Sequence, residues 1–275
     1  IDRASPRRAE SLEPLTMTNP HQPHVTLVGA GPGDPELLTL KAVKAIASAT
    51  VLLVDDLVSD GVTAHASSTA RIVYVGKRGG CQSTPQAFIE KLMVQEALAG
   101  EHVVRLKGGD PFIFGRGGEE VAYLQSHGIA VTVINGITAG LAGVTSLGVP
   151  LTHRDHAHGV VFVTGHAKQD AHNRIDWVGL ARTAAQAKLT LVIYMGVKGA
   201  ADLQQALLQG LAADTPVAIV QNASLPTQRH AVCTLCELHS TLKREALASP
   251  SVMVIGDVLQ GLLALQAPAQ RQAVS

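Results

Sequence analysis

The residues best suited to chemistry gather in a glycine-rich segment, KGGDPFIFGRGGEE, at positions 107–120. A lysine beside such a loop is typical of a phosphate site, because exposed backbone N–H groups can cradle an anion. Asp110, Glu119 and Glu120 would instead repel a phosphate held there. The segment therefore favours a ligand that tolerates nearby carboxylates, such as a zwitterion or a sulfonium cation.

Two near-matches to nucleotide motifs also fail. GAGPGD at 29–34 lacks the third glycine of G-x-G-x-x-G, because Asp34 stands in its place. GRGGEE at 115–120 fails in the same way, and no G-x-x-x-x-G-K-[ST] occurs. Each loop alone could be no more than a tight turn, but several at successive strand ends favour a shared ligand.

Charged residues on or near these loops are candidate acids, bases and anion-binding groups. Lys77, Arg116 and Arg154 could form a local basic pocket, although a lone arginine is more often a solvated charge. Such a pocket would predict a multiply acidic substrate. Asp55, or Glu119 by position, could accept a proton. The formal net charge of zero gives no reason to expect nucleic acid or an anionic membrane as a partner.

One cluster has a spacing that suggests zinc: His230, Cys233, Cys236 and His239. Residues 229–235 alternate as a strand, so side chains three positions apart would point to opposite faces. Zinc sites usually join two separated ligand pairs across a turn. We therefore expect no metal. Three cysteines make no disulfide framework in 275 residues, which favours a reducing, cytoplasmic compartment.

The elements that position these groups are short apolar runs alternating with helical patterns. We expect strands at 25–30, 50–56, 72–80, 102–110, 131–135, 160–165, 189–196, 216–224, 229–235 and 251–256. We expect helices at 34–49, 84–100, 118–126, 174–183, 199–210, between the last two strands, and at 257–265. This alternation predicts parallel βαβ units, in which ligands bind at the carboxyl ends of the strands.

The pattern divides into two α/β domains with a cleft between them. We expect an N-terminal tail at 1–23, a first domain at 24–140 and a second at 159–265, with a C-terminal tail at 266–275. Residues 141–158, rich in Gly, Thr and His, are expected as a linker and ligand-facing turn. No apolar run approaches the ~18 residues of a membrane-spanning helix.

Nine motifs in order resemble the tetrapyrrole methylase family: VGAGPGD, VDDLVS, VGKRGG, RLKGGDPFIFGRGGEE, NGITAG, GVPLTHRD, VTGH, YMG and VQNAS. The resemblance spans residues 25–262 and is greatest to members that methylate uroporphyrinogen III. It implies a two-domain α/β fold, unlike Rossmann-like methyltransferases, with S-adenosylmethionine bent in the cleft. The implied reaction is two successive methylations, by way of precorrin-1, to precorrin-2, a precursor of sirohaem and cobalamin. S-adenosylhomocysteine would be the by-product, no metal would be needed, and the enzyme would be a homodimer.

The resemblance also implies roles for individual residues. The cofactor contacts would be Pro32, Gly108, Gly109, Asp110, Ile113, Thr138, Ala139, Met195 and Ala223. The proton acceptor would be Asp55 and the proton donor Lys77. From the residues themselves we add that Arg116 and Arg154 bind substrate carboxylates. Glu119 would face a pyrrole N–H or orient Arg116.

The chain departs from the family pattern at four positions. Asp56 stands where the pattern has arginine, which changes the charge beside the expected base. The other departures are Val54 for tyrosine, Asn135 for proline and Ala223 for glycine.

Three other functions stay open at this point. The nearest is the same fold acting on another precorrin or a different acceptor. A nicotinamide-dependent oxidoreductase is disfavoured by the incomplete dinucleotide fingerprint. A non-catalytic cofactor-binding module is disfavoured by the candidate acids and bases.

Overall fold

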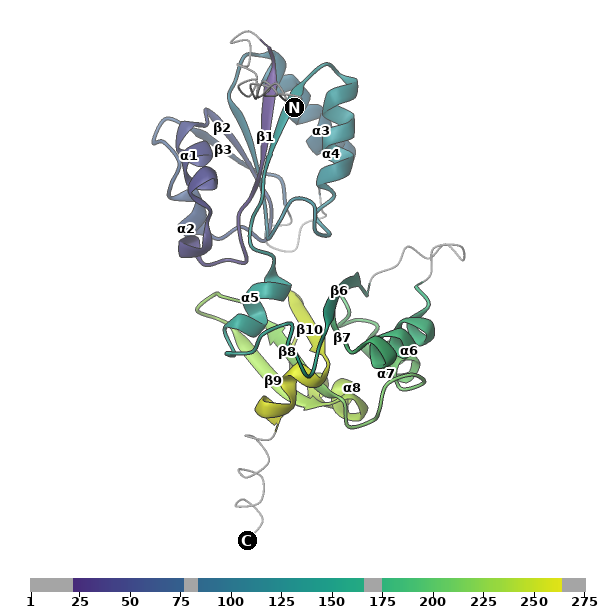
Figure 1. The fold of residues 1–275 in the computed structure, drawn as a ribbon. Coiled ribbons are helices and arrows are strands. Elements are labelled where there is room, and N and C mark those ends of the chain that lie inside the picture. Colours follow the sequence, from purple (N-terminus) through teal and green to yellow (C-terminus); the bar gives the residue numbers. More distant parts are fainter. Residues whose placement is uncertain (1–21, 77–83, 166–174, 264–275) are drawn as a thin grey trace, which may run out of the picture.

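The computed structural model describes residues 22–76, 84–165 and 175–263. These residues form two α/β units, each built on a five-stranded sheet (Figure 1). None of the helices in the described ranges is long and apolar enough to span a bilayer.

The first unit is an all-parallel sheet with the strand order β3-β2-β4-β1-β5. Its strands are β1 (His24–Gly29), β2 (Val51–Val54), β3 (Arg71–Tyr74), β4 (Val103–Lys107) and β5 (Ala130–Ile134). Its helices are η1 (Pro35–Leu37), α1 (Leu40–Ser48), α2 (Asp60–Thr63), α3 (Gln86–Leu98) and α4 (Gly117–Ser126). Helices α1 and α2 cover one face and α3 and α4 the other (Figure 1). Burial on both faces explains why the central strands are almost continuously apolar.

One helix of this unit differs from its sequence-based prediction. The single helix expected at 34–49 is split, because Leu38 is extended between η1 and α1. Two capping residues explain the break: Asp34 accepts from the N–H of Glu36, and Thr39 accepts from the N–H of Ala42.

The second unit is a mixed sheet with the strand order β6-β7-β10-β8-β9. Its strands are β6 (Gly159–Thr164), β7 (Leu189–Tyr194), β8 (Pro216–Gln221), β9 (Arg229–Thr234) and β10 (Ser251–Ile255). Its helices are α6 (Trp177–Ala187), α7 (Ala200–Leu207), η3 (Leu235–Glu237), α8 (Leu238–Arg244) and η4 (Asp257–Leu259). The largest apolar cluster of this unit includes buried residues of α6, α7, α8 and their strands.

The prediction of parallel units throughout is wrong for the second sheet. β6 and β7 are parallel, but β9 and β10 run antiparallel to their neighbours. The connection between β8 and β9 covers only residues 222–228, which is too short for the helical crossover that parallel neighbours need.

A helix that the sequence did not predict, α5 (Ala139–Thr145), lies where a linker and turn were expected. Glycine disfavours a helix interior by about 1 kcal/mol, so its sequence AGLAGVT looks like a loop. The two glycines instead let the helix approach the second sheet closely. A Cβ on Gly140 would lie 2.4 Å from the Tyr194 hydroxyl, and one on Gly143 would lie 3.3 Å from Val252.

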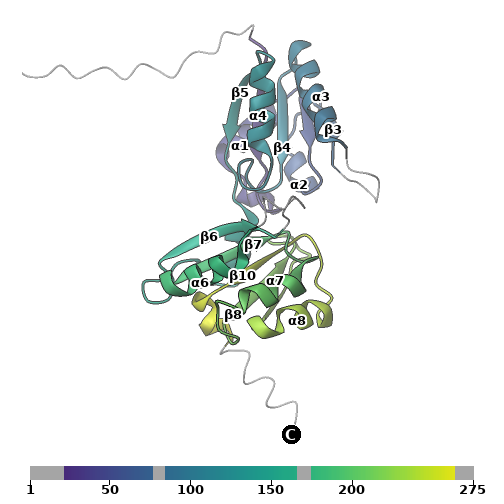
Figure 2. The ribbon, with the colours of Figure 1, turned by 90° about the vertical axis from the view of Figure 1, so that its right-hand side faces the viewer.

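The two units meet along the loops that follow the strands of the first sheet (Figure 2). In a parallel sheet these loops all leave from one edge, so they can converge on one ligand. Asp55 directly follows β2, and the Gly108–Gly109 loop directly follows β4. The fold therefore gathers the chemistry-bearing loops at the junction of the units.

Candidate active site

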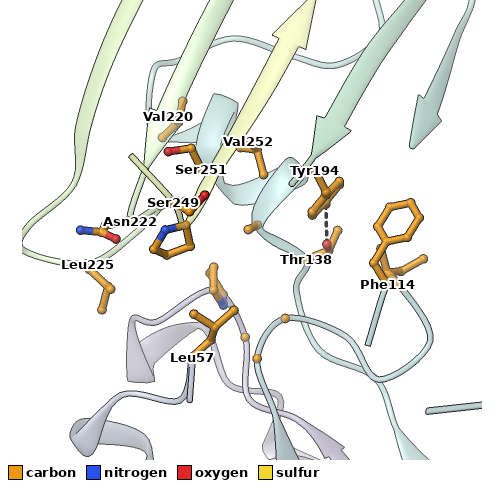
Figure 3. A pocket seen from close by; sticks show the side chains of 18 of the residues that line it. Leu57, Phe114, Thr138, Tyr194, Val220, Asn222, Leu225, Ser249, Ser251 and Val252 are labelled. Atoms are coloured by element: carbon orange, nitrogen blue, oxygen red, sulfur yellow. Dashed lines mark hydrogen bonds between the residues drawn. The ribbon is translucent and has the colours of Figure 1, made fainter. Parts of the chain in front are cut away.

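A pocket of about 560 Å³ lies between the two units (Figure 3). The first unit contributes the loops after β1, β2 and β4, and the second contributes residues around the ends of β7, β8 and β10. Eight of the nine expected cofactor residues line it: Pro32, Gly108, Gly109, Ile113, Thr138, Ala139, Met195 and Ala223. The structure thus brings together residues that are up to about two-thirds of the chain apart in sequence.

Part of the pocket wall from the first unit is glycine backbone, at Gly31, Gly108 and Gly109. The N–H of Gly109 donates to the carbonyl of Gly31 at 2.7 Å, and the reverse bond spans 3.2 Å. Gly109 has φ +67°, a conformation that glycine adopts without steric cost. A Cβ on Gly136 would lie 2.2 Å from the carbonyl oxygen of Gly109, so only glycine fits there.

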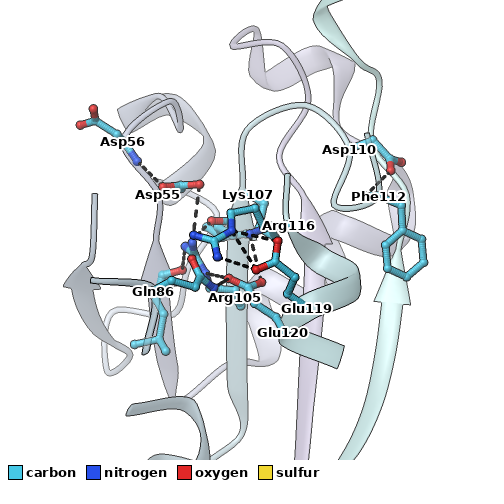
Figure 4. Close-up of polar contacts among 12 residues, drawn as sticks. Asp55, Asp56, Gln86, Arg105, Lys107, Asp110, Phe112, Arg116, Glu119 and Glu120 are labelled. Carbon is cyan, nitrogen blue, oxygen red and sulfur yellow. Dashed lines mark hydrogen bonds and ion pairs between the residues drawn. The ribbon is translucent and has the colours of Figure 1, made fainter. Parts of the chain in front are cut away.

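Asp110 lies behind this wall rather than in the pocket. Its Oδ1 accepts from the N–H of Phe112 at 2.8 Å (Figure 4). Its Oδ2 accepts from the N–H of Gly136 at 3.0 Å and from Nδ2 of Asn135 at 3.1 Å. The geometry favours Asp110 as the residue that ties the loops after β4 and β5 together, over direct contact with a cationic ligand.

Replacing Asp110 by alanine should weaken cofactor binding by loosening those loops. The change leaves the part-buried N–H groups of Phe112 and Gly136 without their acceptor, at about 1 kcal/mol each. We expect the Kd for S-adenosylhomocysteine, measured by calorimetry, to rise about tenfold or more. The melting temperature should fall as well. Alanine at the exposed Asp214 is the matched control, and equal Kd values for the two variants would contradict this role of Asp110.

An aromatic group closes one end of the pocket. The Tyr194 hydroxyl accepts from the N–H of Gly140 at 2.8 Å and hydrogen-bonds the Thr138 hydroxyl at 2.6 Å. Burial raises the pKa of this phenol. The ring of Phe114 lies 5.0 Å from that of Tyr194. Sequence reasoning missed both rings, although an aromatic residue inside the glycine loop of a chain with 3% aromatics was a usable signal.

Backbone strain also concentrates here. Phe114, Met195 and Asn222 line the pocket and all have φ between +52° and +55°. Left-handed backbone costs a residue with a side chain roughly 1–2 kcal/mol, and such residues cluster at functional sites. The pocket is therefore lined by backbone conformations that these three residues disfavour on their own.

Asp55 lies next to the pocket-lining Asp56, with its carboxylate fixed from two sides. Its Oδ1 accepts from the N–H of Asp56 at 3.0 Å, and its Oδ2 lies 3.5 Å from Nη2 of Arg105. The side chain is 35% exposed, so a ligand can reach it. The neighbouring Asp56 lines the pocket, and its carboxylate points away from Asp55 (Figure 4). The family departure at position 56 therefore adds a negative charge to the pocket lining. This charge is directed away from Asp55, the expected base.

Beneath Asp55 lies a group of buried charges that sequence reasoning missed. Arg105 and Lys107 come from β4 and Glu120 from α4, with side-chain exposures of 2%, 3% and 0%. Nε of Arg105 lies 3.4 Å from Glu120, and Nζ of Lys107 lies 3.0 Å from it. Burial, and then the Arg105 cation, lower the pKa of Lys107. The signal in the sequence was VVRLK, where two cations occupy alternate positions of an apolar strand.

Arg116 and Glu119 form an exposed pair at the start of α4. Nε of Arg116 donates to both carboxylate oxygens of Glu119 at 3.1 Å. These hydrogen bonds raise the pKa of Arg116. Of the two roles expected for Glu119, the geometry shows the arrangement that orients Arg116. Contact with a pyrrole N–H stays a prediction.

Arg154 is not brought near the pocket by the described structure. Arg154 is exposed in the bridged turn that precedes β6, whereas the opposite end of β6 pairs with Tyr194. A six-residue strand separates these ends by roughly 17 Å. Binding of a substrate carboxylate by Arg154 stays a prediction. Lys77 lies outside the described residues.

The Cys/His cluster adds nothing to the pocket. Cys233 is buried in the core of the second unit, and burial raises the pKa of its thiol to about 11. Cys236 is exposed. In the described ranges, no group of three or more His, Cys, Asp and Glu side chains is placed to hold a metal ion.

The residues of the pocket fit the expected cofactor. Its volume lies within the usual range of about 300–1,000 Å³ for small-molecule sites. Bare glycine backbone lets an extended ligand lie close to the first unit, and Asp56 supplies a carboxylate for a cationic group. The fold and the pocket thus define a two-domain α/β protein that binds a small ligand between its sheets without a Rossmann phosphate loop.

Comparison with known proteins identifies the family. The model for tetrapyrrole (corrin/porphyrin) methylases matches residues 24–239. A uroporphyrinogen-III C-methyltransferase from Pseudomonas aeruginosa is 53% identical over 240 residues, which are 87% of this chain and 95% of that protein. A siroheme synthase from Thiobacillus denitrificans is 45% identical over 87% of this chain and 50% of its own length. The chain belongs to the tetrapyrrole methylase family.

A solved structure supports the same assignment. The uroporphyrin-III C-methyltransferase from Thermus thermophilus, complexed with S-adenosylhomocysteine, matches with a TM-score of 0.71 and 40% identity. The match covers 86% of this chain and 99% of that one.

Proposed function

We propose that the protein transfers methyl groups from S-adenosylmethionine to carbon atoms of uroporphyrinogen III, twice in succession, to give precorrin-2 by way of precorrin-1. The observation that carries the proposal is the pocket between the units, where eight expected cofactor residues meet, with Asp55 adjacent in sequence to the lining residue Asp56. Relatives named for this activity align over nearly the full length of both chains.

The protein's part in the reaction is to position reactants and to remove a proton. S-adenosylmethionine, when bound, supplies an already activated methyl group, so alignment is the main requirement. The residues that would hold it are the glycine loops after β1 and β4, Met195 and Ala223. The pyrrole carbon attacks the methyl group as the carbon–sulfur bond of the sulfonium breaks, which leaves positive charge on the macrocycle, and a proton must then leave the macrocycle from another atom. Asp55 is the partly exposed carboxylate beside the pocket-lining Asp56 that accepts this proton.

Arg116 is proposed to bind a carboxylate of the acceptor. Uroporphyrinogen III carries eight carboxylates, and arginine makes forked contacts with such groups. Arg116 is exposed, stands on the same loop as Phe114, and is oriented by Glu119. The donor pocket and the acceptor site would therefore share the segment 107–120.

Replacing Arg116 by asparagine should raise the KM for uroporphyrinogen III about five- to tenfold, because a charge-assisted hydrogen bond of about 1.5–3 kcal/mol is partly offset by solvent exposure. Asparagine is chosen because position 116 has φ +58°, which asparagine tolerates. Steady-state kinetics should show this rise while the Kd for S-adenosylhomocysteine stays unchanged. Asparagine at the exposed Arg182 of α6 is the control. A loss of cofactor affinity with an unchanged KM would overturn this role.

We propose further that the protein acts as a homodimer in the cytoplasm and has no nucleic-acid partner. Ile72 and Tyr74 are exposed apolar side chains on β3, an edge strand, and such an edge is suited to a subunit contact. The zero formal net charge argues against nucleic acid. Sedimentation equilibrium tests the dimer.

The acceptor is tested with methyl-labelled S-adenosylmethionine and a panel of reduced tetrapyrroles. We expect label in the tetrapyrrole fraction with enzymatically made uroporphyrinogen III, and far less with its type I isomer or with later precorrins. Label transferred only to another tetrapyrrole would keep the fold and the cofactor but replace the proposed acceptor.

A further inference from the structure

The buried charges beneath Asp55 need an explanation beyond folding. Arg105, Lys107 and Glu120 are almost completely shielded from water (Figure 4). Burying an ion costs several kcal/mol, and apolar residues of similar volume often stabilise a fold as well or better. Charges retained at such a cost next to a pocket are candidates for a functional role.

Glu120 helps to hold the guanidinium group of Arg105 in place. Its Oε1 lies 3.4 Å from Nε of Arg105 and accepts from Nε2 of Gln86 at 3.0 Å. Nη1 of Arg105 donates to the carbonyls of Leu53 and Leu106, at 3.3 and 3.0 Å. With Nε and Nη1 engaged, the plane of the guanidinium is set, and Nη2 lies 3.5 Å from Oδ2 of Asp55.

Lys107 is the second buried cation paired with Glu120. Its Nζ lies 3.0 Å from Oε2 of Glu120, yet Oε2 has no hydrogen bond of adequate geometry. Among the described residues it is the one buried side-chain oxygen or nitrogen in that condition. Glu120 is thus held by two cations and one amide, and of these three partners Arg105 is the one within ion-pair distance of Asp55 in the described contacts.

We propose that Glu120 is a positioning residue for the methyl-transfer reaction, which acts through Arg105 to hold the Asp55 carboxylate in place. This inference rests on the proposed role of Asp55. Glu120 and Arg105 do not line the pocket, so they act on the base rather than on the cofactor. Without the Glu120 charge, Arg105 is free to turn, and Asp55 loses the fixed partner of its Oδ2.

The inference is tested by a double-mutant cycle with Glu120→Gln and Asp55→Asn. Glu120→Gln alone should lower kcat about tenfold, with the Kd for S-adenosylhomocysteine within about twofold of wild type. In the Asp55→Asn background, the same substitution should change the residual rate by less than about twofold, because residues that act through one another are non-additive. A residue with only a structural role would lower both rates by the same factor.

A matched control separates catalysis from stability. Glu96 is another buried glutamate, paired with Arg71 far along the first unit from the pocket lining. Glu96→Gln should lower the melting temperature but leave kcat unchanged. If Glu120→Gln does not fold, Glu120→Asp keeps the charge and withdraws the carboxylate from Arg105. It should lower kcat several-fold in the wild-type background and not in Asp55→Asn.

The outcomes distinguish this inference from the proposed function. Equal effects of the Glu120 substitutions in both backgrounds, or full kcat in a folded Glu120 variant, would overturn the positioning role while the function stands. Full activity of Asp55→Asn would remove Asp55 as the proton acceptor and the positioning role with it. Cofactor binding, read by calorimetry, should be intact in every variant of the cycle.

Discussion

Asp55→Asn should lower kcat by about 10²–10³ while the enzyme keeps its fold and its cofactor affinity, since general-base catalysis typically contributes 10²–10⁴. Asparagine is isosteric and keeps an oxygen to accept from the N–H of Asp56. The substitution therefore removes the negative charge and the proton-accepting oxygen with little change in the local structure. Because Asp55 is absent from the pocket lining, the Kd for S-adenosylhomocysteine should stay within about twofold.

The measurement is single-turnover methylation of uroporphyrinogen III with saturating cofactor, which isolates the chemical step from product release. Asp202→Asn, at an exposed position of α7 in the second unit, is the matched control and should keep the wild-type rate. A rate for Asp55→Asn within about threefold of wild type would show that another group removes the proton.

Gly136→Ala should disrupt the cofactor site more than any other single methyl group added to these loops. The new Cβ would lie 2.2 Å from the carbonyl oxygen of Gly109 and 2.8 Å from backbone atoms of Gly29. These are backbone atoms of two other loops, which cannot turn aside as a flexible side chain can. Overpacking of this kind costs typically 1–3 kcal/mol, and relief requires the loops after β1 and β4 to separate.

We expect a Kd for S-adenosylhomocysteine raised more than tenfold, by calorimetry, together with a melting temperature lowered by about 2–4 °C per kcal/mol. Gly118→Ala is the matched control from the same glycine-rich segment, because a Cβ there meets nothing within 4 Å. It should bind the cofactor normally. Normal affinity of Gly136→Ala would mean that the contact among the three loops does not shape the site.

The parts of the fold that the sequence predicted are those set by local patterns. Apolar strands such as VLLV at 51–54 and the loops that follow them are visible because buried parallel strands must be apolar and must end in turns. The same rule placed Asp55 and the Gly108–Gly109 loop at one edge of the first sheet. Antiparallel β9 and β10 were missed because strand direction depends on non-local pairing.

The parts that could not be predicted depend on contacts between distant segments. The glycines of α5 suggested a linker because glycine disfavours a helix. In the structure they let the helix approach Tyr194 and Val252 closely, and this contact exists only once the second sheet is formed. Asp110 looked like a ligand-facing anion because its partners Asn135 and Gly136 are on another loop.

The group formed by Arg105, Lys107 and Glu120 shows the same limit within the site. Arg105 and Lys107 could be noticed in the sequence because charged residues are unusual in an apolar strand. Their pairing with Glu120 could not be predicted, because it depends on the packing of α4 on β4. Arg154 is the opposite case, in which the residue type suggested a site that the fold does not support. An arginine suits an acidic substrate, but the place of Arg154 in the second unit is remote from the pocket.

The most direct test of the account is the number of labelled methyl groups in the product. The protein is incubated with uroporphyrinogen III and excess methyl-labelled S-adenosylmethionine, and the tetrapyrroles are analysed by mass and absorbance over time. We expect a singly methylated intermediate followed by a product with two labelled methyl groups. We also expect Asp55→Asn to slow both transfers. A product that stops at one methyl group, a tetrapyrrole without label, or wild-type rates for Asp55→Asn would contradict these expectations.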